Sequence, residues 1–305
     1  MIDLIFSNVD KNYGKNIAIK DINLSVMQGE IFGLIGPDGA GKTSIMRIAA
    51  TLLQQSSGIV EVLRLNNNKD FREIRTKLGY MPGKFSLYPD LTVEENLSLF
   101  ASIFGTTIKD NYYLIKDIYE QIEPFKNRLA GKLSGGMKQK LALSCALIHK
   151  PELLLLDEPT TGVDPVSRKE FWEMLKKLNK LGITIFVSTP YMDEAALCDR
   201  VALIQSGRIL QTSTPISLIK QFNQELLGIK SENKYKTLLD LRNYEFAERV
   251  YPSGEYLHYT DKREISNIQS IDDYLATKDN HNISIQNIQP DIEDCFMKLM
   301  VQQDD

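Results

Sequence analysis

The chain has 305 residues, 43% hydrophobic and 25% charged, which is enough for one large core or for a core with a smaller second unit. No apolar run approaches the ~20 residues of a membrane-spanning helix, and the N-terminus lacks the pattern of a secretory signal, so we expect a cytoplasmic protein. Residues 225–305 carry 9 basic and 16 acidic side chains, a net charge of −7 that repels phosphate backbones, so we expect no nucleic-acid partner.

Two domains are expected. Up to about residue 220, short β-branched runs alternate with helical patterns, which predicts an α/β domain with a largely parallel sheet. After Phe222 the pattern weakens into short pieces separated by turns, as is typical of a small α+β domain. We place the first domain at residues 1–222 and the second at residues 223–305. The three cysteines are widely separated and are expected in the core, whereas the three histidines are expected at the surface.

A glycine-rich stretch follows a predicted strand, residues 29–35, and precedes the apolar pattern of a helix. It fits G-x-x-x-x-G-K-[ST], in which backbone N–H groups surround anionic oxygens, Lys42 reaches the terminal phosphates and the Thr43 hydroxyl can bind Mg²⁺. The sequence therefore predicts an ATP and Mg²⁺ site. Its predicted nucleotide-binding residues are Gly36, Pro37, Asp38, Gly39, Ala40, Gly41, Lys42, Thr43 and Ser44.

Two helices are predicted next. Thr92 with Glu95 forms a capping box that opens a helix through Phe100. Between residues 137 and 148, apolar residues recur at steps of four, four and three, which places them on one helical face. The residues before this helix read Leu-Ser-Gly-Gly, and on their own they indicate that Ser134 caps the helix ahead of a flexible glycine pair.

An apolar strand, residues 153–156, ends in the adjacent acids Asp157 and Glu158. Because such a strand is buried on both faces, we expect Asp157 to emerge at the edge where open α/β sheets bind ligands. There Asp157 can hold Mg²⁺, and Glu158 can orient or deprotonate an attacking water. Two acids in isolation would more often cap a helix, but the glycine loop favours the catalytic interpretation.

The α/β pattern closes with a helix and a strand. Residues 167–181 form the predicted helix, which Gly182 ends. Residues 183–187 form the strand, and Pro190 stops the extended stretch that follows it.

The order of these motifs resembles the ATP-binding subunit of an ABC transporter. The resemblance covers residues 1–222 and implies a P-loop NTPase fold with a helical subdomain at about residues 85–150. It implies that the family's signature motif, which here begins in the Leu-Ser-Gly-Gly stretch, contacts the nucleotide of a second ATP-binding subunit. It also implies that Asp164 lies in the loop linking the two nucleotide sites and that Tyr13 stacks on adenine. A lone Tyr would otherwise more often pack at the surface. The signature residues are Ser134, Gly135, Gly136 and Gln139.

Two positions depart from the family pattern. Gly83 stands where the family has a glutamine that contacts Mg²⁺ and water, and Pro190 stands where it has a histidine that contacts the γ-phosphate. The resemblance therefore implies an ATPase that binds ATP and hydrolyses it slowly at its own P-loop. Its partner ATPase is either a different chain with an active site or a second copy with an equally slow site.

Residues 83–97 and 285–296 resemble export-type members whose membrane permeases are separate chains. This implies a position on the inner face of the cell membrane, with Phe85 and Tyr88 either in a groove that receives the permease or in ordinary core. Two alternatives are an ATP-switched module acting on ribosomes or DNA and an ATP-binding regulator with negligible turnover. The single P-loop, the lack of a long coiled-coil insertion and the retained Glu158 favour the exporter subunit.

Overall fold

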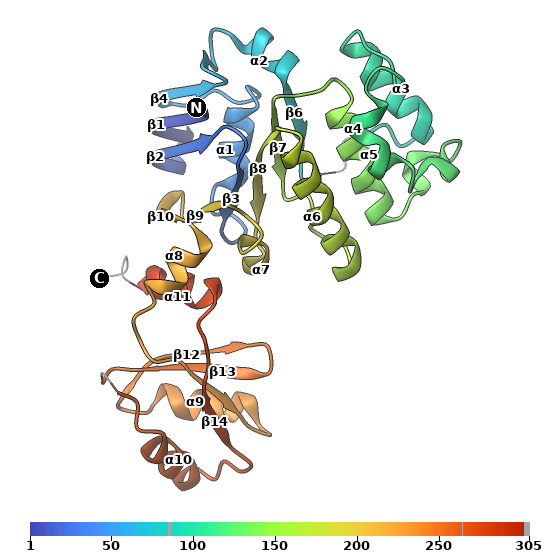
Figure 1. Cartoon of the computed structure of the whole chain (residues 1–305). Coiled ribbons are helices and arrows are strands. Elements are labelled where there is room, and N and C mark those ends of the chain that lie inside the picture. The colour runs from blue at the N-terminus through green and yellow to red at the C-terminus, as the bar shows by residue number, and fades with distance from the viewer. Residues whose placement is uncertain (85–86, 264, 302–305) are drawn as a thin grey trace. The chain divides into compact units, whose positions relative to one another are not determined.

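The computed structural model describes residues 1–84, 87–263 and 265–301 (Figure 1). The chain forms two compact units. The first comprises residues 1–216 together with the end of the chain from residue 299, and the second comprises residues 217–298. The division falls within a few residues of the boundary expected at residue 222. Within the described ranges, no helix is long and apolar enough to cross a membrane.

The first unit contains two sheets. An antiparallel sheet has the order β2-β1-β4-β5, and a larger sheet has the order β10-β9-β3-β8-β7-β6 and is parallel except for β10. The strands are β1 (Ile2–Tyr13), β2 (Asn16–Met27), β3 (Ile31–Ile35), β4 (Ser57–Val62), β5 (Leu65–Asn66), β6 (Leu78–Met81), β7 (Leu153–Asp157), β8 (Thr184–Thr189), β9 (Arg200–Gln205) and β10 (Arg208–Ser213). The predicted α/β architecture with a mainly parallel sheet is confirmed.

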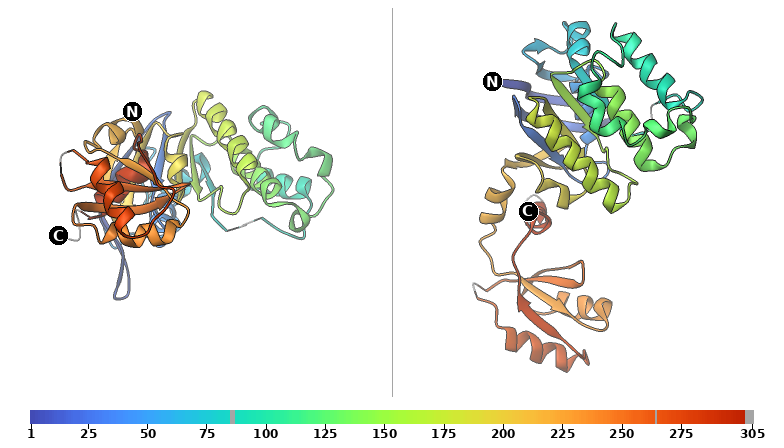
Figure 2. Two further views of the ribbon diagram at one scale, coloured as in Figure 1. Left: turned by 90° about the horizontal axis from the view of Figure 1, so that it is seen from below. Right: turned by 45° about the vertical axis from the view of Figure 1, so that its right-hand side comes forward.

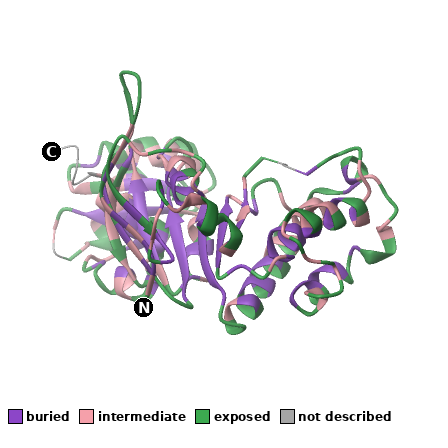
Figure 3. Cartoon of the chain, turned by 90° about the horizontal axis from the view of Figure 1, so that it is seen from above, coloured by how far each residue is buried: buried purple, intermediate pink, exposed green. Residues whose placement is uncertain are grey.

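The middle strands of the larger sheet form its core. Every residue of β3, β7 and β8 is buried, and Figure 3 shows strands in purple, the colour of buried residues, at the centre of the sheet. A central parallel strand is covered on both faces, which explains the uninterrupted run of four leucines in β7. Each buried leucine contributes about 1.5–3 kcal/mol relative to an exposed one, so these strands fix the sheet firmly.

Helices flank this sheet. The first-unit helices are α1 (Lys42–Ala49), α2 (Phe71–Lys77), α3 (Val93–Ile103), α4 (Tyr112–Tyr119), α5 (Gly135–Leu147), α6 (Pro165–Lys180) and α7 (Met192–Ala195), with short 3₁₀ turns at Glu123–Phe125 and Ala130–Lys132; α8 (Pro215–Lys220) follows β10. Figures 1 and 2 show α3, α4 and α5 as one group, away from β1 and β2. The predicted capping box of Thr92 and Glu95 is present and opens α3.

The second unit is a small α+β fold, as predicted. Its antiparallel sheet has the order β12-β13-β11-β14, and its core joins that sheet to two helices. The elements are β11 (Leu227–Lys230), α9 (Lys234–Arg242), β12 (Ala247–Ser253), β13 (Tyr256–Asp261), α10 (Ile268–Thr277), β14 (Ser284–Asn287) and α11 (Ile292–Val301).

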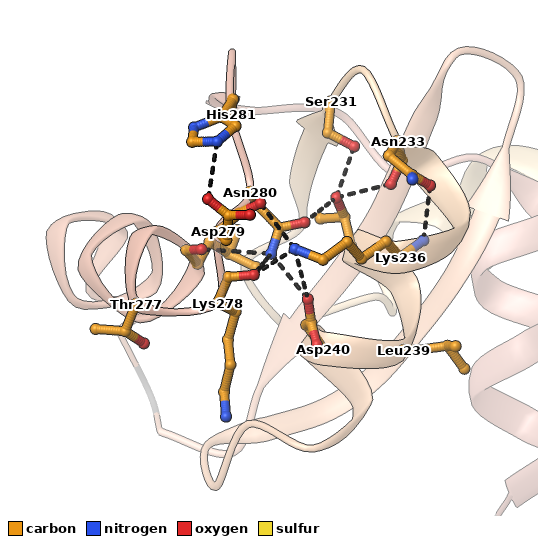
Figure 4. A network of polar contacts seen from close by, with 12 residues as sticks. Ser231, Asn233, Lys236, Leu239, Asp240, Thr277, Lys278, Asp279, Asn280 and His281 are labelled. Carbon is orange, nitrogen blue, oxygen red and sulfur yellow. Dashed lines mark hydrogen bonds and ion pairs between the residues drawn. The ribbon is translucent and has the colours of Figure 1, made fainter.

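A polar network joins α9 to the loop after α10 (Figure 4). Lys236 donates to the main-chain oxygens of Lys278 and Asp279, which lie at the C-terminal end of α10. The buried Asn280 donates to Asp240 and accepts from the Thr237 hydroxyl at 2.9 Å. Because a cation at a helix C-terminus also offsets the helix dipole, this network stabilises the packing of the two helices.

A buried cluster of ionisable side chains lies between β12, β13 and α11. His258 Nδ1 lies 2.6 Å from Asp294 Oδ1, and the Tyr251 hydroxyl donates to the same oxygen at 2.5 Å. The expectation that every histidine lies at the surface is therefore wrong for His258, because β13 carries it beneath α11. The predicted burial of all three cysteines is confirmed. Burial alone would raise the pKa of Asp294, but hydrogen bonds from His258 and Tyr251 hold that pKa below its ordinary value.

We expect Asp294→Asn to lower the free energy of unfolding of the second unit by about 2 kcal/mol at pH 7, because two hydrogen bonds to a charged carboxylate are weakened. A lowered carboxyl pKa stabilises the fold above the unfolded value of about 3.9, and this stabilisation is lost as the pH falls through the lower folded value. The difference between the two proteins should therefore shrink below about pH 4. Hydrogen exchange of the β12 and β13 amides measures this difference in the free energy of unfolding.

Asp272→Asn, at an exposed carboxylate of α10, is the matched control and should change little. Equal protection of β12 and β13 in the Asp294 and Asp272 variants at pH 7 would contradict a stabilising role for the buried cluster.

Candidate functional site

Four neighbouring parallel strands end at the same edge of the larger sheet. β3 leads into the loop that starts at Gly36, β8 leads into Pro190, β7 ends in Asp157 followed by Glu158, and β6 leads to Gly83. Segments that are far apart in the sequence therefore meet where open parallel sheets bind their ligands.

The glycine loop fits tightly between its neighbours. A Cβ added to Gly36 would lie 2.2 Å from the main-chain oxygen of Ile204, and one added to Gly41 would lie 2.7 Å from the Ile19 side chain and 2.8 Å from the Ala18 oxygen. Gly41 also has a φ of +102°, a conformation that L side chains rarely adopt. Close packing therefore requires both glycines, and the left-handed backbone conformation is a second requirement at Gly41.

Lys42 opens α1 and turns its side chain back into the loop. Its ammonium donates to the main-chain oxygens of Gly36 at 2.8 Å and Pro37 at 2.9 Å, and it lies 3.1 Å from Glu158 Oε1. The side chain is 2% exposed, so this buried positive charge is fully partnered. Asp38 lies 4.0 Å away but is 89% exposed and contributes little.

Asp157 is buried at the end of β7. Its Oδ1 accepts from the Ser188 hydroxyl at 2.8 Å and from the Thr43 hydroxyl at 3.3 Å. Burial raises the pKa of Asp157, while these two hydrogen bonds act in the opposite direction. The predicted pair of Mg²⁺ ligands, Thr43 and Asp157, is thus brought into direct contact.

Glu158 adopts an unusual backbone conformation, with a φ of +51°. Its N–H donates to both the main-chain oxygen and the hydroxyl of Ser188, each at 3.1 Å. Its carboxylate is 22% exposed and faces Lys42. A left-handed conformation at a non-glycine residue is sustained only where neighbours fix it, and such residues cluster at functional sites.

A pocket of about 380 Å³ adjoins the loop. It is lined by Asn16, Ile17, Ala18, Gly39, Gly41, Lys42, Thr43, Ser44, Glu158, Ser206 and Gly207. Tyr13, the predicted adenine-stacking residue, is 47% exposed, and its hydroxyl lies 3.4 Å from the Ser44 hydroxyl. The structure therefore brings Tyr13 to the predicted nucleotide-binding loop.

Sequence reasoning missed the residues that β2 and the β9–β10 turn contribute to this pocket. Gly207, with a φ of +76°, donates from its N–H to the Ala40 oxygen at 3.0 Å and accepts from the Lys20 N–H at 2.8 Å. The Ser206-Gly207 pair is a recognisable turn signal between two strands, but only the strand order reveals that the turn lies against the glycine loop.

The signature residues lie elsewhere. Ser134 caps α5 by accepting from the Met137 N–H at 3.4 Å; Ser134 and Gly135 are exposed, and Gly136 and Gln139 are half-buried. Among the described residues, those lining the pocket beside the glycine loop include none of these four. The cap expected from the residues alone is confirmed, and contact with a second subunit's nucleotide remains a prediction.

Asp164 caps α6. Its Oδ1 accepts from the N–H groups of Val166 at 3.1 Å and Ser167 at 3.0 Å, and the bonds from Ser167 hold the pKa of Asp164 below its ordinary value. A Cβ on Gly136 would lie 3.1 Å from the Ser167 hydroxyl, so the start of α5 is packed against the start of α6. The role of Asp164 in linking two sites remains a prediction.

The two substituted positions flank the acids. A Cβ added to Gly83 would lie 2.9 Å from the Asp157 main-chain oxygen, so any larger residue there requires the backbone to shift. Pro190 follows Thr189, whose oxygen accepts from the Gly36 N–H at 3.3 Å. Neither position offers a polar side chain to the site.

A second pocket, of about 210 Å³ and mainly apolar, lies between the sheet and the α3–α5 group. It is lined by Ala50, Leu52, Arg75, Leu78, Tyr80, Met81, Leu87, Phe100, Phe104, Ala142, Cys145, Ala146 and His149. Tyr88 is 52% exposed and is not among these residues, whereas Phe85 lies outside the described residues. His149 stacks on Phe104 at 3.7 Å, and burial lowers its pKa.

Known proteins share this architecture. A model of the ABC transporter family matches residues 19–161. The probable multidrug ABC transporter ATP-binding protein YbhF of Escherichia coli (strain K12) is 38% identical over 288 residues, 93% of this chain and 49% of YbhF, so the chain spans about half that relative's length. The Nod factor export ATP-binding protein I of Burkholderia lata is 38% identical over 256 residues, 83% of this chain and 84% of that protein. A solved dimer of the ATP-binding cassette MJ0796 with ADP and Pi has a TM-score of 0.63 at 27% identity, covering 69% of this chain and 98% of that one.

We expect Gly41→Ala to weaken binding of a fluorescent ATP analogue about tenfold or more, because the new Cβ forces the loop away from Ile19 and Ala18. Gly105→Ala is the matched control: Gly105 also has a positive φ, of +67°, but no atom lies within 4 Å of its added Cβ. The control shows whether a Cβ at a positive φ, without a close contact, disturbs the fold. Unchanged affinity in Gly41→Ala, measured by titration, would contradict the packing requirement.

Proposed function

Because this chain belongs to the ABC transporter family of ATP-binding proteins, we propose that it is the ATPase subunit of an exporter and binds Mg-ATP at the Gly36–Ser44 loop. Hydrolysis of the bound ATP then drives transport through a separate membrane permease, and the chain lies on the cytoplasmic side of that permease. The contact that carries this proposal is the one between the loop and the end of β7. There the Thr43 hydroxyl lies 3.3 Å from Asp157 Oδ1, and the Lys42 ammonium lies 3.1 Å from Glu158.

The donor atoms fit Mg²⁺ bound together with a nucleotide. Thr43 and Asp157 offer a hydroxyl and a carboxylate oxygen, which are the hard ligands Mg²⁺ prefers. No group of three or more His, Cys, Asp or Glu side chains that could hold a metal ion occurs in the described part of the chain, so the remaining ligands would be phosphate oxygens and water. When bound, Mg²⁺ neutralises charge that develops on the phosphate oxygens.

The chain's own residues divide the remaining work. The backbone N–H groups of the glycine loop and the N-terminus of α1 bind phosphate oxygens, and Lys42 holds the terminal phosphates. Glu158 orients the attacking water and accepts its proton. The Tyr13 ring stacks on the adenine, and its half-exposed position beside Ser44 supports the assignment.

A second ATP-binding subunit would complete the site. The exposed Ser134 and Gly135 at the start of α5 present backbone N–H groups and a helix N-terminus, which suit a γ-phosphate held by another chain. Asp164, which caps α6 beside Gly136, would lie at the contact between the subunits. The dimeric MJ0796 cassette, bound to ADP and Pi, supports this arrangement.

The permease would dock over the apolar pocket between the sheet and α3–α5. Phe100, Phe104 and Leu87 supply an apolar lining, and Tyr88 and Leu52 are more than half exposed at 52% and 56%. Leu52 lines this apolar pocket and is itself exposed, and exposed apolar surface of this kind suits an interaction site. The relatives, which include a Nod factor export ATP-binding protein and a probable multidrug ABC transporter ATP-binding protein, support export as the direction.

Hydrolysis at this chain's own loop is slow in this proposal. A positioned polar group contributes ~10² to 10⁴ in rate, and Gly83 and Pro190 supply none. The groups that bind Mg-ATP are retained, so affinity is preserved while turnover falls. Such a chain pairs with a more active ATPase or forms a dimer of two slow sites.

We expect Pro190→His to raise the single-turnover rate of ATP hydrolysis about tenfold or more, because an imidazole replaces an apolar ring at the end of β8. Pro190→Ala is the matched control, since it frees the backbone without adding an imidazole. Radiolabelled ATP with enzyme in excess gives the rate. Adding Glu158→Gln to the histidine variant should abolish the increase, and an increase that survives this change would place the gain outside the proposed site.

A further inference from the structure

Ser188 is a buried hydroxyl on the strand between the glycine loop and the two acids. It lies in β8, which pairs with β3 on one side and β7 on the other, and it is 0% exposed. A buried hydroxyl costs free energy unless it is hydrogen-bonded. Ser188 both donates and accepts, and each of its two bonds goes to one of the acidic residues.

The first bond reaches the predicted metal ligand. The Ser188 hydroxyl donates to Asp157 Oδ1 at 2.8 Å, which is shorter than the 3.3 Å contact from Thr43 to the same oxygen. Thr43 has one hydroxyl proton, and its oxygen would also serve as a ligand of the metal. Of these two donors to Asp157, Ser188 is the one that would not also bind the metal.

The second bond reaches the backbone of the proposed base. The Glu158 N–H is shared between the Ser188 hydroxyl and the Ser188 main-chain oxygen, both at 3.1 Å. Glu158 has a φ of +51°, which is uncommon for a residue with a side chain. Two acceptors on one residue therefore hold Glu158 in a conformation that it would otherwise leave.

We propose that Ser188 is a positioning residue that fixes Asp157 and Glu158 relative to each other. This inference rests on the proposed function. The hydroxyl orients the Asp157 carboxylate toward the metal position and fixes the start of the turn that carries the Glu158 side chain. Residues that hydrogen-bond to a metal ligand without contacting the metal typically contribute 10-fold to 100-fold to metal affinity or activity.

Three variants test this proposal. Ser188→Ala removes the hydroxyl, Ser188→Thr keeps it, and Thr184→Val removes another buried hydroxyl from the far end of the same strand. Thr184 is also 0% exposed, donates to Asp3 at 2.7 Å and accepts from the Gly29 N–H at 2.8 Å. Thr184→Val therefore removes the same number of hydrogen bonds as Ser188→Ala, but Thr184 contacts neither Asp157 nor Glu158. Thermal unfolding shows that each variant is folded.

The readouts are binding of a fluorescent ATP analogue, with Mg²⁺ and with EDTA, and single-turnover hydrolysis. For Ser188→Ala we expect the gain in affinity that Mg²⁺ gives to fall about tenfold or more, and the turnover rate to fall as well. Affinity in EDTA should stay within about twofold, because Lys42 and the loop amides are unchanged. Ser188→Thr should recover most of the Mg²⁺ dependence, and Thr184→Val should retain all of it.

A Ser188→Ala protein that matches Thr184→Val in both Mg²⁺ dependence and turnover would overturn the positioning role while leaving the proposed function intact. A wild-type chain that binds the analogue equally well with Mg²⁺ and with EDTA would overturn both. Should Ser188→Thr unfold because its added methyl group does not fit, the comparison of Ser188→Ala with Thr184→Val still decides.

Discussion

The parallel pairing of β3, β8, β7 and β6 is the constraint on which the first unit depends. Parallel strands share a direction, so the segments that follow them meet at one edge, and the register sets which side chains face each other. Asp157 pairs with Ser188 in this register, and a slip of one residue would turn either side chain to the opposite face. The apolar, fully buried strands hold that register because every alternative would expose them or bury polar groups without partners.

Burying the charged groups at this edge costs free energy. Their hydrogen-bond and ion-pair partners offset that cost and keep the groups charged beside the pocket. Lys42 is held by two main-chain oxygens and by Glu158, while Asp157 is held by two hydroxyls. Each charge is therefore satisfied but remains close to the pocket beside the loop. The positive φ of Glu158 belongs to the same arrangement, since backbone strain of this kind costs ~1 to 3 kcal/mol and persists only where neighbours fix it.

Local patterns predicted much of this fold, and long-range contacts account for what they missed. The glycine loop, the capping box of α3 and the buried strand before Asp157 are each specified by adjacent residues, so they could be read directly. Ser188 and Gly207 could not, because their roles depend on which strands become neighbours in the sheet. His258 was wrongly expected at the surface for the same reason: β13 and α11 meet over it, and a lone histidine gives no local signal of that packing.

A structure of the Glu158→Gln chain trapped with Mg-ATP tests the central claim most directly. We expect the triphosphate to lie along Gly36–Ser44, with the metal between Thr43 and Asp157 and the Ser134 and Gly135 amides of a second subunit at the terminal phosphate. A triphosphate bound away from this loop, or a loaded dimer in which those amides face solvent, would contradict it.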